Sequence, residues 1–231
     1  MLGYATRQQR IAIAGADDLI VRSLLDRQQF FDPLGVAERL GISSATWPMF
    51  GLLWPSGAEL AARLISRAPR RGERILEIGC GLALPSLAGH RRGQDITASD
   101  CHPLAGDFLA CNAALNGLPP LPYRHGHWAV RSAIEHPCDG VAAPLHGRFD
   151  LIIGSDLLYE RDEGGALAAF VGRHATDSAE VWIVDPDRSN RPAFHRRMAA
   201  LGFAVLEERL DRPASGEHEA YKGRLLTYRR Q

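Results

Sequence analysis

Short apolar runs alternate along the chain with stretches in which apolar residues recur every three or four positions, the pattern of strands alternating with helices. Buried strands are predicted at residues 74–78, 95–100, 121–128, 149–154 and 180–184. Helical spacing predicts one helix that starts at Pro55 and ends before Pro69, and further helices at residues 103–116, 163–174 and 192–201. This order predicts an α/β fold in which helices cover a mostly parallel sheet.

The two ends of the chain depart from this alternation. Residues 204–210 and 225–228 are strand patterns joined by a polar loop near 212–219, which predicts a C-terminal antiparallel hairpin. Near the start, β-like runs at 10–13 and 19–21 flank a turn, and a short helix pattern at 33–42 follows. We expect one domain over residues 1–231, with an N-terminal β/α extension at 1–53 and the core at 54–231.

A glycine turn follows the strand at 74–78, where the chain reads RILEIGCGLALP. Gly79 and Gly81 permit a tight turn at which backbone N–H groups approach a ligand closely. Glu77 at the strand end offers a carboxylate to hydroxyls or to a cation. Asp100 follows Gly81 by nineteen residues, the spacing at which nucleotide-binding βαβ units place an acceptor for ribose hydroxyls. Leu84 stands where a dinucleotide fingerprint requires Gly or Ala, which argues against NAD.

A second polar group follows the strand at 149–154, where Ser155, Asp156 and Tyr159 occur in succession. Ligands of doubly wound sheets bind at the carboxyl ends of the strands, so these residues are expected to face the same crevice as the glycine turn. The alternative is that Asp156 caps the next helix while Tyr159 packs beneath it. Among the aromatic residues near position 50, Trp47 and Phe50 are expected to fill space in the core.

Composition narrows the function further. Lys+Arg and Asp+Glu both number 27, so no strong field attracts nucleic acid or an anionic membrane. The first residues lack a signal peptide and no apolar run approaches 18 residues, which predicts a cytoplasmic protein. The four cysteines lack metal-binding or redox spacing and are expected to be reduced thiols. His125 and His127 have no partner at metal-ligand spacing, so no metal is expected.

The pattern Glu77-x-Gly79-x-Gly81 followed by Asp100 resembles the S-adenosylmethionine site of the class I (seven-strand) methyltransferases, whose third glycine would fall at Ala83. Together with FGLLWPSGAELAARLI, ITASD and FDLIIGSDLLYE, it resembles methyltransferase family sixteen over residues 50–160. Characterised members of that family are mostly protein-lysine methyltransferases. The resemblance implies a three-layer, Rossmann-like, seven-stranded methyltransferase sheet.

The resemblance also implies roles for individual residues. The tryptophan matching Trp54 contacts the cofactor, the acid matching Asp100 holds its ribose, and the tryptophan matching Trp128 lies near its adenine. The family usually has an acid before that tryptophan, where this chain has His127. The expected cofactor-binding residues are Trp54, Glu77, Gly79, Gly81, Asp100, Trp128 and Ser155, and the expected catalytic residues are Asp156 and Tyr159.

The activity implied is transfer of a methyl group from S-adenosylmethionine to an amine, which must lose its proton before it attacks. The first expectation is a lysine side chain of a protein, oriented by Asp156 and bordered by Tyr159. Two alternatives stay open: an N-methyltransferase acting on a small nicotinamide-like amine, and a cofactor-binding scaffold without turnover.

Overall fold

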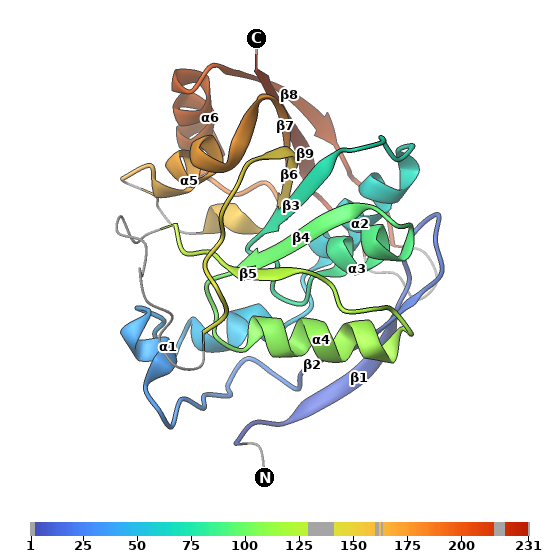
Figure 1. The fold of residues 1–231 in the computed structure, drawn as a ribbon, viewed down its shortest axis with the longest axis vertical. Coiled ribbons are helices and arrows are strands. Elements are labelled where there is room, and N and C mark those ends of the chain that lie inside the picture. Colours follow the sequence, from blue (N-terminus) through green and yellow to red (C-terminus); the bar gives the residue numbers. More distant parts are fainter. Residues whose placement is uncertain (1–2, 129–140, 160–161, 163, 215–219, 231) are drawn as a thin grey trace.

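The computed structural model describes residues 3–128, 141–159, 162, 164–214 and 220–230. A seven-stranded sheet lies at its centre, in the order β5-β4-β3-β6-β7-β9-β8 (Figure 1). The first four pairs in this order are parallel, and β9 pairs antiparallel with both β7 and β8. The strands are β3 (Arg74–Ile78), β4 (Asp95–Asp100), β5 (Tyr123–His125), β6 (Phe149–Ser155), β7 (Ala175–Asp185), β8 (Phe203–Arg209) and β9 (Arg224–Arg230). The predicted fold class, including its C-terminal hairpin, is confirmed.

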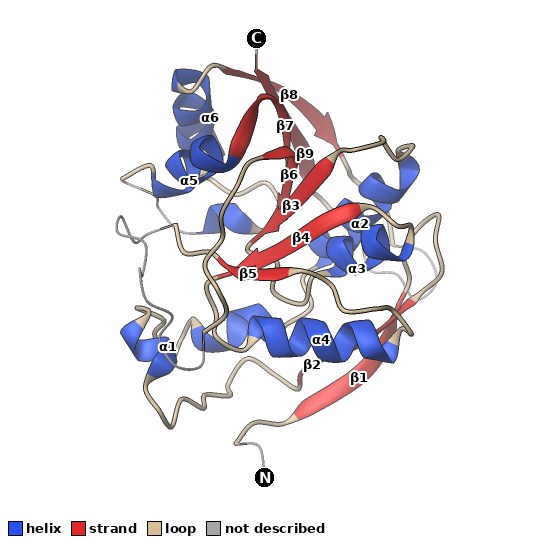
Figure 2. Ribbon diagram, viewed as in Figure 1, coloured by secondary structure: helices blue, strands red, loops and turns tan. Residues whose placement is uncertain are grey.

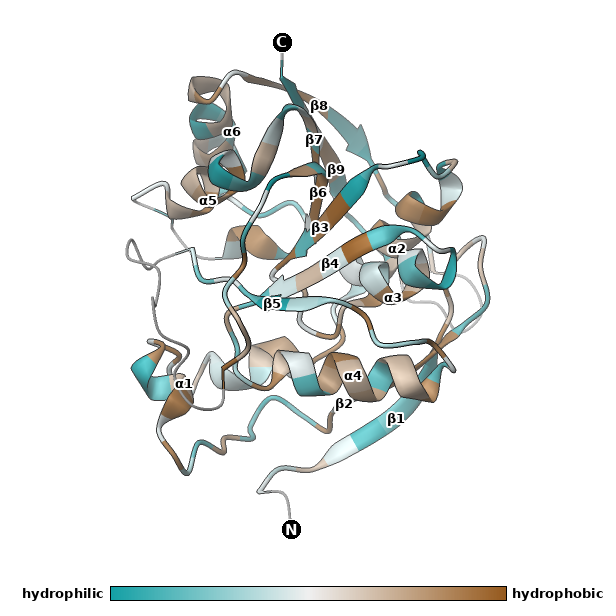
Figure 3. Cartoon of the chain, viewed as in Figure 1, coloured by the Kyte–Doolittle hydropathy of each residue, from teal (hydrophilic) through white to brown (hydrophobic). Residues whose placement is uncertain are grey.

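Helices cover both faces of the sheet, which gives three layers (Figure 2). One face carries α2 (Pro55–Ser66), α3 (Leu84–Arg91) and α4 (Ala105–Leu115), and the other carries α5 (Ala166–His174) and α6 (Arg191–Ala200). Alternate residues of a strand serve different faces, as Leu151 and Ile153 pack on the first and Ile152 on the second. Burial on both faces explains the apolar run at residues 151–153 of β6, which appears brown in Figure 3.

The N-terminal extension forms a separate hairpin of β1 (Thr6–Ile11) and β2 (Leu19–Leu24), followed by α1 (Val36–Arg39) and a 3-10 helix η1 (Trp47–Gly51). Side-chain amides of α4 and of its C-cap residue complete the outer edge of β2. Asn112 Oδ1 accepts the N–H of Arg22 at 2.8 Å, and Asn116 Oδ1 accepts that of Ile20 at 2.9 Å. The buried face of β2 shares one hydrophobic cluster with α2, α3 and α4. The extent of the single domain stays a prediction.

Several predicted boundaries differ from the structure. The helix expected at 33–42 shrinks to four residues because Gly35 and Gly41 adopt positive φ angles of 62° and 76° at its two ends. The strand expected at 121–128 is only three residues long, since it pairs with β4 at Ala98–Asp100 alone. Of the connection expected at 131–147, residues 131–140 lie outside the described residues, as do 215–219 of the C-terminal loop.

Two further expectations concern the described part of the chain. Cys80, Cys101 and Cys111 form no disulfide there, and Cys138 lies outside the described residues. Over the same residues, no helix combines the length and apolar character needed to cross a membrane.

We expect Asn112→Ala to destabilise the protein by about 1–3 kcal/mol, because it removes a buried side chain and leaves the partly buried N–H and C=O of Arg22 without these partners. Urea unfolding followed by circular dichroism measures this change. Ala110→Ser, on the exposed side of the same helix, is the control and should change the free energy of unfolding by less than about 0.5 kcal/mol. Equal stability of the two variants would show that α4 does not hold β2.

Candidate functional site

A cavity of about 330 Å³ opens at the carboxyl ends of β3, β4 and β6, a volume within the range of small-molecule sites. Every residue that the sequence singled out for a functional role lines this cavity: Trp54, Glu77, Gly79, Gly81, Asp100, Trp128, Ser155, Asp156 and Tyr159. The structure therefore brings the predicted residues together. Their individual roles remain predictions.

The glycine turn and the second strand are joined by one carboxylate. Asp100 Oδ2 accepts the N–H of Gly81 at 2.8 Å, and its Oδ1 accepts the N–H of His102 at 2.8 Å. Gly81 has a φ of 50°, and a Cβ there would lie 2.8 Å from the backbone oxygen of Phe50. Only glycine fits this position, because both the backbone conformation and the contact with η1 exclude a side chain.

The position of the expected third glycine adopts the conformation that glycine would favour. Ala83 has a φ of 57°, and its N–H donates to the carbonyl of Cys80 at 2.6 Å. Left-handed conformations are unfavourable for alanine by about 1–2 kcal/mol. The loop thus keeps the turn without the glycine, at a local energetic cost.

Glu77 is buried and holds the start of α3. Its Oε2 accepts the backbone N–H of Ser86 at 2.8 Å and also accepts the Ser86 hydroxyl. Burial raises the pKa of Glu77 to about 8, and burial likewise raises the pKa of Asp100. No described basic side chain forms an ion pair with either carboxylate. This end of the cavity therefore favours a ligand that carries positive charge and hydroxyl groups.

Aromatic side chains from the extension and from the loop after β5 form the cavity walls. Trp54 donates its Nε1–H to the carbonyl of Met49 at 2.9 Å, which fixes the indole plane. Phe50 stacks on His102 with ring centroids 3.7 Å apart. Trp47 is buried as expected of a core residue, whereas Phe50 both packs in the core and lines the cavity. Burial lowers the pKa of His102 to about 3, so its imidazole is neutral.

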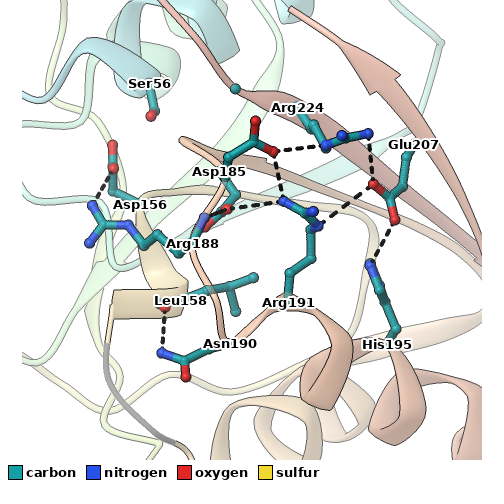
Figure 4. A network of polar contacts seen from close by, with 12 residues as sticks. Ser56, Asp156, Leu158, Asp185, Arg188, Asn190, Arg191, His195, Glu207 and Arg224 are labelled. Carbon is teal, nitrogen blue, oxygen red and sulfur yellow. Dashed lines mark hydrogen bonds and ion pairs between the residues drawn. The ribbon is translucent and has the colours of Figure 1, made fainter.

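The residues after β6 form the other end of the cavity, and Figure 4 shows one of them, Asp156, beside Arg188. Asp156 has a φ of 58°, and its N–H donates to Val184 at the end of β7 at 3.0 Å. Its Oδ1 lies 2.7 Å from Nη2 of Arg188, while its Oδ2 has no partner. The helix-cap alternative is not what the structure shows, because this carboxylate accepts no backbone N–H of the 3-10 helix η2 (Leu157–Tyr159).

Tyr159 does not pack beneath that helix either, since 49% of it is exposed. It lies at the mouth of the cavity and also borders an adjoining cavity of about 420 Å³ between η2 and α6. Trp128 and Leu157 line both cavities as well.

Sequence reasoning missed two contributions to the site. Arg188 follows β7, the neighbour of β6 in the sheet, so the rule that ligands bind at the carboxyl ends of strands gave a signal for it. The residues near position 50 were expected mainly to fill the core, yet Met49, Leu52 and Leu53 belong to the cavity wall. Among the described residues, no group of three His, Cys, Asp or Glu side chains is arranged to hold a metal ion.

The residues fit S-adenosylmethionine. Its ribose hydroxyls suit the Asp100 carboxylate, and its sulfonium and ammonium groups suit a cavity end with two buried acids and no paired cation. The glycine turn gives the close backbone approach that such a ligand requires, and Trp128 offers an aromatic face.

No protein-family model matches the sequence. Among curated proteins, the chain is 29% identical over 193 residues to the electron transfer flavoprotein beta subunit lysine methyltransferase of Mus musculus, covering 81% of this chain and 69% of that protein. The human protein of the same name is 25% identical, covering 74% of this chain and 62% of the relative. The magnesium-protoporphyrin O-methyltransferase of Rhodobacter capsulatus is 30% identical over 58% of this chain and 56% of its own length. The chain thus spans between about half and about two thirds of these relatives.

Solved structures share the fold at low identity. Magnesium protoporphyrin IX methyltransferase from Synechocystis PCC 6803 with bound SAM superposes with a TM-score of 0.54 and 17% identity, covering 75% of this chain and 77% of that one. A TehB-like SAM-dependent methyltransferase from Corynebacterium glutamicum gives 0.54 and 17%, covering 74% and 88%.

We expect the stability of the cofactor-free protein to depend on pH through Glu77. Its folded pKa of about 8 lies above the ordinary value of 4.5, so the folded state binds the extra proton between these values. Stability from this group is therefore full below about pH 4.5 and is lost as pH rises toward about 8. The side chain of Glu77→Gln stays neutral at all these pH values. The free energy of unfolding of this variant should therefore rise, relative to that of the wild type, by on the order of a few kcal/mol between about pH 5 and pH 8.

Urea unfolding of both proteins at several pH values measures this difference, in which the titration of all other groups cancels. Ser86→Ala keeps the Glu77 carboxylate and is the matched control. Relative to that of Glu77→Gln, its free energy of unfolding should fall as pH rises, as that of the wild type does. A difference between wild type and Glu77→Gln that is constant with pH would contradict a buried Glu77 with a raised pKa.

Proposed function

Since the chain is a class I methyltransferase with S-adenosylmethionine as its cofactor, we propose that it transfers the methyl group to a lysine side chain of a protein. The observation that carries this proposal is the end of the cavity after β6, where Asp156 and Tyr159 line the same cavity as the glycine turn. The relatives named as lysine methyltransferases support the same acceptor. We further propose a cytoplasmic location and an acceptor other than nucleic acid, in keeping with the balanced charge.

The proposed division of the site follows the order of the strands. Glu77, Gly79, Gly81 and Asp100, at the ends of β3 and β4, hold the cofactor together with Trp54, Trp128 and Ser155. Bound there, S-adenosylmethionine supplies an electrophilic methyl group on a positively charged sulfur. Asp156 and Tyr159, beyond the end of β6, serve the acceptor.

The chain's residues then have three tasks. Asp156 accepts a hydrogen bond from the amine and so aims its lone pair, which is the alignment that a displacement reaction needs. The half-exposed ring of Tyr159 borders the mouth, where it can contact the lysine stem and exclude water. The buried walls contributed by η1 and the glycine loop keep water from the reacting end of the cavity.

Exposure of the mouth favours a protein acceptor over a small molecule. Tyr159 is 49% exposed, and the adjoining cavity between η2 and α6 continues from the same residues onto the surface. A lysine side chain can enter from such an opening while its backbone stays outside.

Incubation of the purified chain with methyl-labelled S-adenosylmethionine and the purified beta subunit of electron transfer flavoprotein tests the acceptor. We expect label on that protein, and mass spectrometry should place it on lysine. Background from the enzyme itself is easily recognised, because Lys222 is the only lysine of this chain. No label on this subunit would exclude it as the acceptor. In a second incubation with cell lysate, label that enters only the small-molecule fraction would contradict protein-lysine methylation.

We expect Asp156→Asn to lower the single-turnover rate by roughly tenfold to a hundredfold, the range for loss of a hydrogen bond to a charged group. The affinity for S-adenosylmethionine, measured by calorimetry, should change little, because the altered contact is made only at the reacting amine. Tyr159→Phe keeps the ring and removes its hydroxyl. If the ring acts as a wall, Tyr159→Phe should reduce the single-turnover rate less than Asp156→Asn does.

Loss of cofactor binding in Asp156→Asn, with normal turnover of whatever cofactor still binds, would refute the acceptor role of this carboxylate.

A further inference from the structure

A basic side chain shares the acceptor end of the cavity with Asp156. Nη2 of Arg188 lies 2.7 Å from Oδ1 of Asp156, and both residues line the cavity (Figure 4). This is a single hydrogen bond: Nε of Arg188 and Oδ2 of Asp156 are both buried and have no hydrogen-bond partner. Arginine and carboxylate often pair through two parallel bonds, and here the second bond is missing. The carboxylate therefore keeps accepting capacity while it is already paired with a cation.

The backbone on both sides of this ion pair is fixed. Asp185 Oδ1 accepts the N–H of Arg188 at 2.7 Å, and Asn190 Nδ2 donates to the carbonyl of Leu158 at 2.9 Å. The first bond fixes the loop after β7, and the second ties that loop to η2, the segment that follows Asp156. The guanidinium is thus held at the cavity wall, with its side chain 28% exposed.

Other charged or titratable groups lie on the elements around the pair, and Asp185 and Tyr221 interact electrostatically with Asp156. Asp185 at the end of β7 lies 3.9 Å from Arg191 of α6, and burial raises the pKa of Asp185. Tyr221, which precedes β9, hydrogen-bonds Ser56 of α2, and burial raises its pKa so that the phenol stays neutral. Glu59 of α2 pairs with Arg212 at 3.0 Å. Among the described residues, Arg188 is the one cation that forms an ion pair with Asp156.

We propose that Arg188 favours the neutral form of the acceptor lysine, by holding Asp156 in place and by putting a positive charge beside the incoming amine. This inference rests on the proposed function. An unpaired Asp156 would stabilise an ammonium ion, which has no lone pair and cannot react. Paired with Arg188, the carboxylate still orients the amine but no longer selects its charged form.

The proton balance of the reaction follows from this arrangement. The lysine ammonium releases one proton to solvent on entering the site. The amine nitrogen then forms the bond to the methyl carbon, and the electron pair of the broken carbon–sulfur bond stays on the sulfur. A further proton leaves the methylated product if it departs as an amine. Arg188 neither gives nor takes a proton, because a guanidinium stays protonated in proteins, and it is therefore a positioning residue.

The pH dependence of methyl transfer tests the proposal. The ascending limb of the single-turnover rate, measured with saturating S-adenosylmethionine and the beta subunit of electron transfer flavoprotein, reports deprotonation of the bound amine. Removing the charge with Arg188→Met should move this limb to higher pH by roughly one to two units, the shift expected for a charge a few ångströms away at an effective dielectric constant of about 20. Arg188→Lys keeps the charge and should leave the limb near its wild-type position.

Arg209→Gln is the matched control. Arg209 belongs to the ion pairs around Asp187 and Asp211, is exposed, and lies outside the cavity lining. Its loss removes the same formal charge, and the limb should stay in place. Calorimetry with S-adenosylmethionine confirms that each variant is folded, and Arg188→Gln replaces Arg188→Met if the latter does not fold.

The experiment distinguishes failure of this inference from failure of the proposed function. Methyl transfer by the wild type combined with an unmoved limb in the uncharged Arg188 variants would overturn the role of Arg188 alone. A limb that moves equally in Arg209→Gln would also overturn it, since the effect would then come from overall charge. Absence of transfer by the wild type would overturn the proposed function, and this inference with it.

Discussion

The hydrogen bond from the Gly81 N–H to Asp100 fixes the arrangement on which the rest of the site depends. It joins the loop after β3 to the end of β4, whose parallel pairing already sets Ile78 beside Ser99. Because Gly81 also lies against the backbone of Phe50, the same point fixes the N-terminal extension. Three segments that are distant in sequence thus meet around one residue without a side chain. The position of the cavity follows from that meeting.

Two strained backbone positions line the cavity. Of the three described non-glycine residues with positive φ angles, only Asp187 lies outside the cavity lining, and Ala83 and Asp156 stand in the loops after β3 and after β6. Each is held by its own N–H, the first to Cys80 and the second to Val184. Such conformations persist only where the surrounding structure determines them, and they occur often at functional sites. The loops are therefore held in place before any ligand arrives.

The sequence predicted those parts of the molecule that depend on local periodicity and on chain order. Apolar runs located the central strands, and the distance from Gly81 to Asp100 located one side of the cavity, because a βαβ unit fixes that distance. The short helix at Val36–Arg39 was overestimated, since the pattern of apolar residues does not report the conformations of Gly35 and Gly41. Limits of this kind are set by backbone geometry, which hydrophobic spacing does not encode.

The pairing of Arg188 with Asp156 belongs to a different class of feature. The two residues are 32 positions apart, in the loops that follow two adjacent strands whose order in the sheet is known only from the fold. A polar residue after β7 was visible in the sequence. Its partner was not, because loop conformation decides which side chains meet. The role that the sequence predicted for Asp156 therefore did not include Arg188, the cation that offsets the charge of its carboxylate.

Charge is distributed unequally between the two ends of the cavity, and this distribution bears on turnover. Glu77 and Asp100 are buried without a cationic partner, so each is stabilised in its ionised form by a positively charged ligand. The methyl donor carries one more positive charge than the demethylated product, because the sulfonium becomes a neutral thioether. The two carboxylates consequently favour the donor over the product. At the other end, Asp156 is already paired with Arg188 and does not compete for that positive charge. In the proposed division of the site, the two acids that would hold the donor would thus also favour its exchange for spent cofactor.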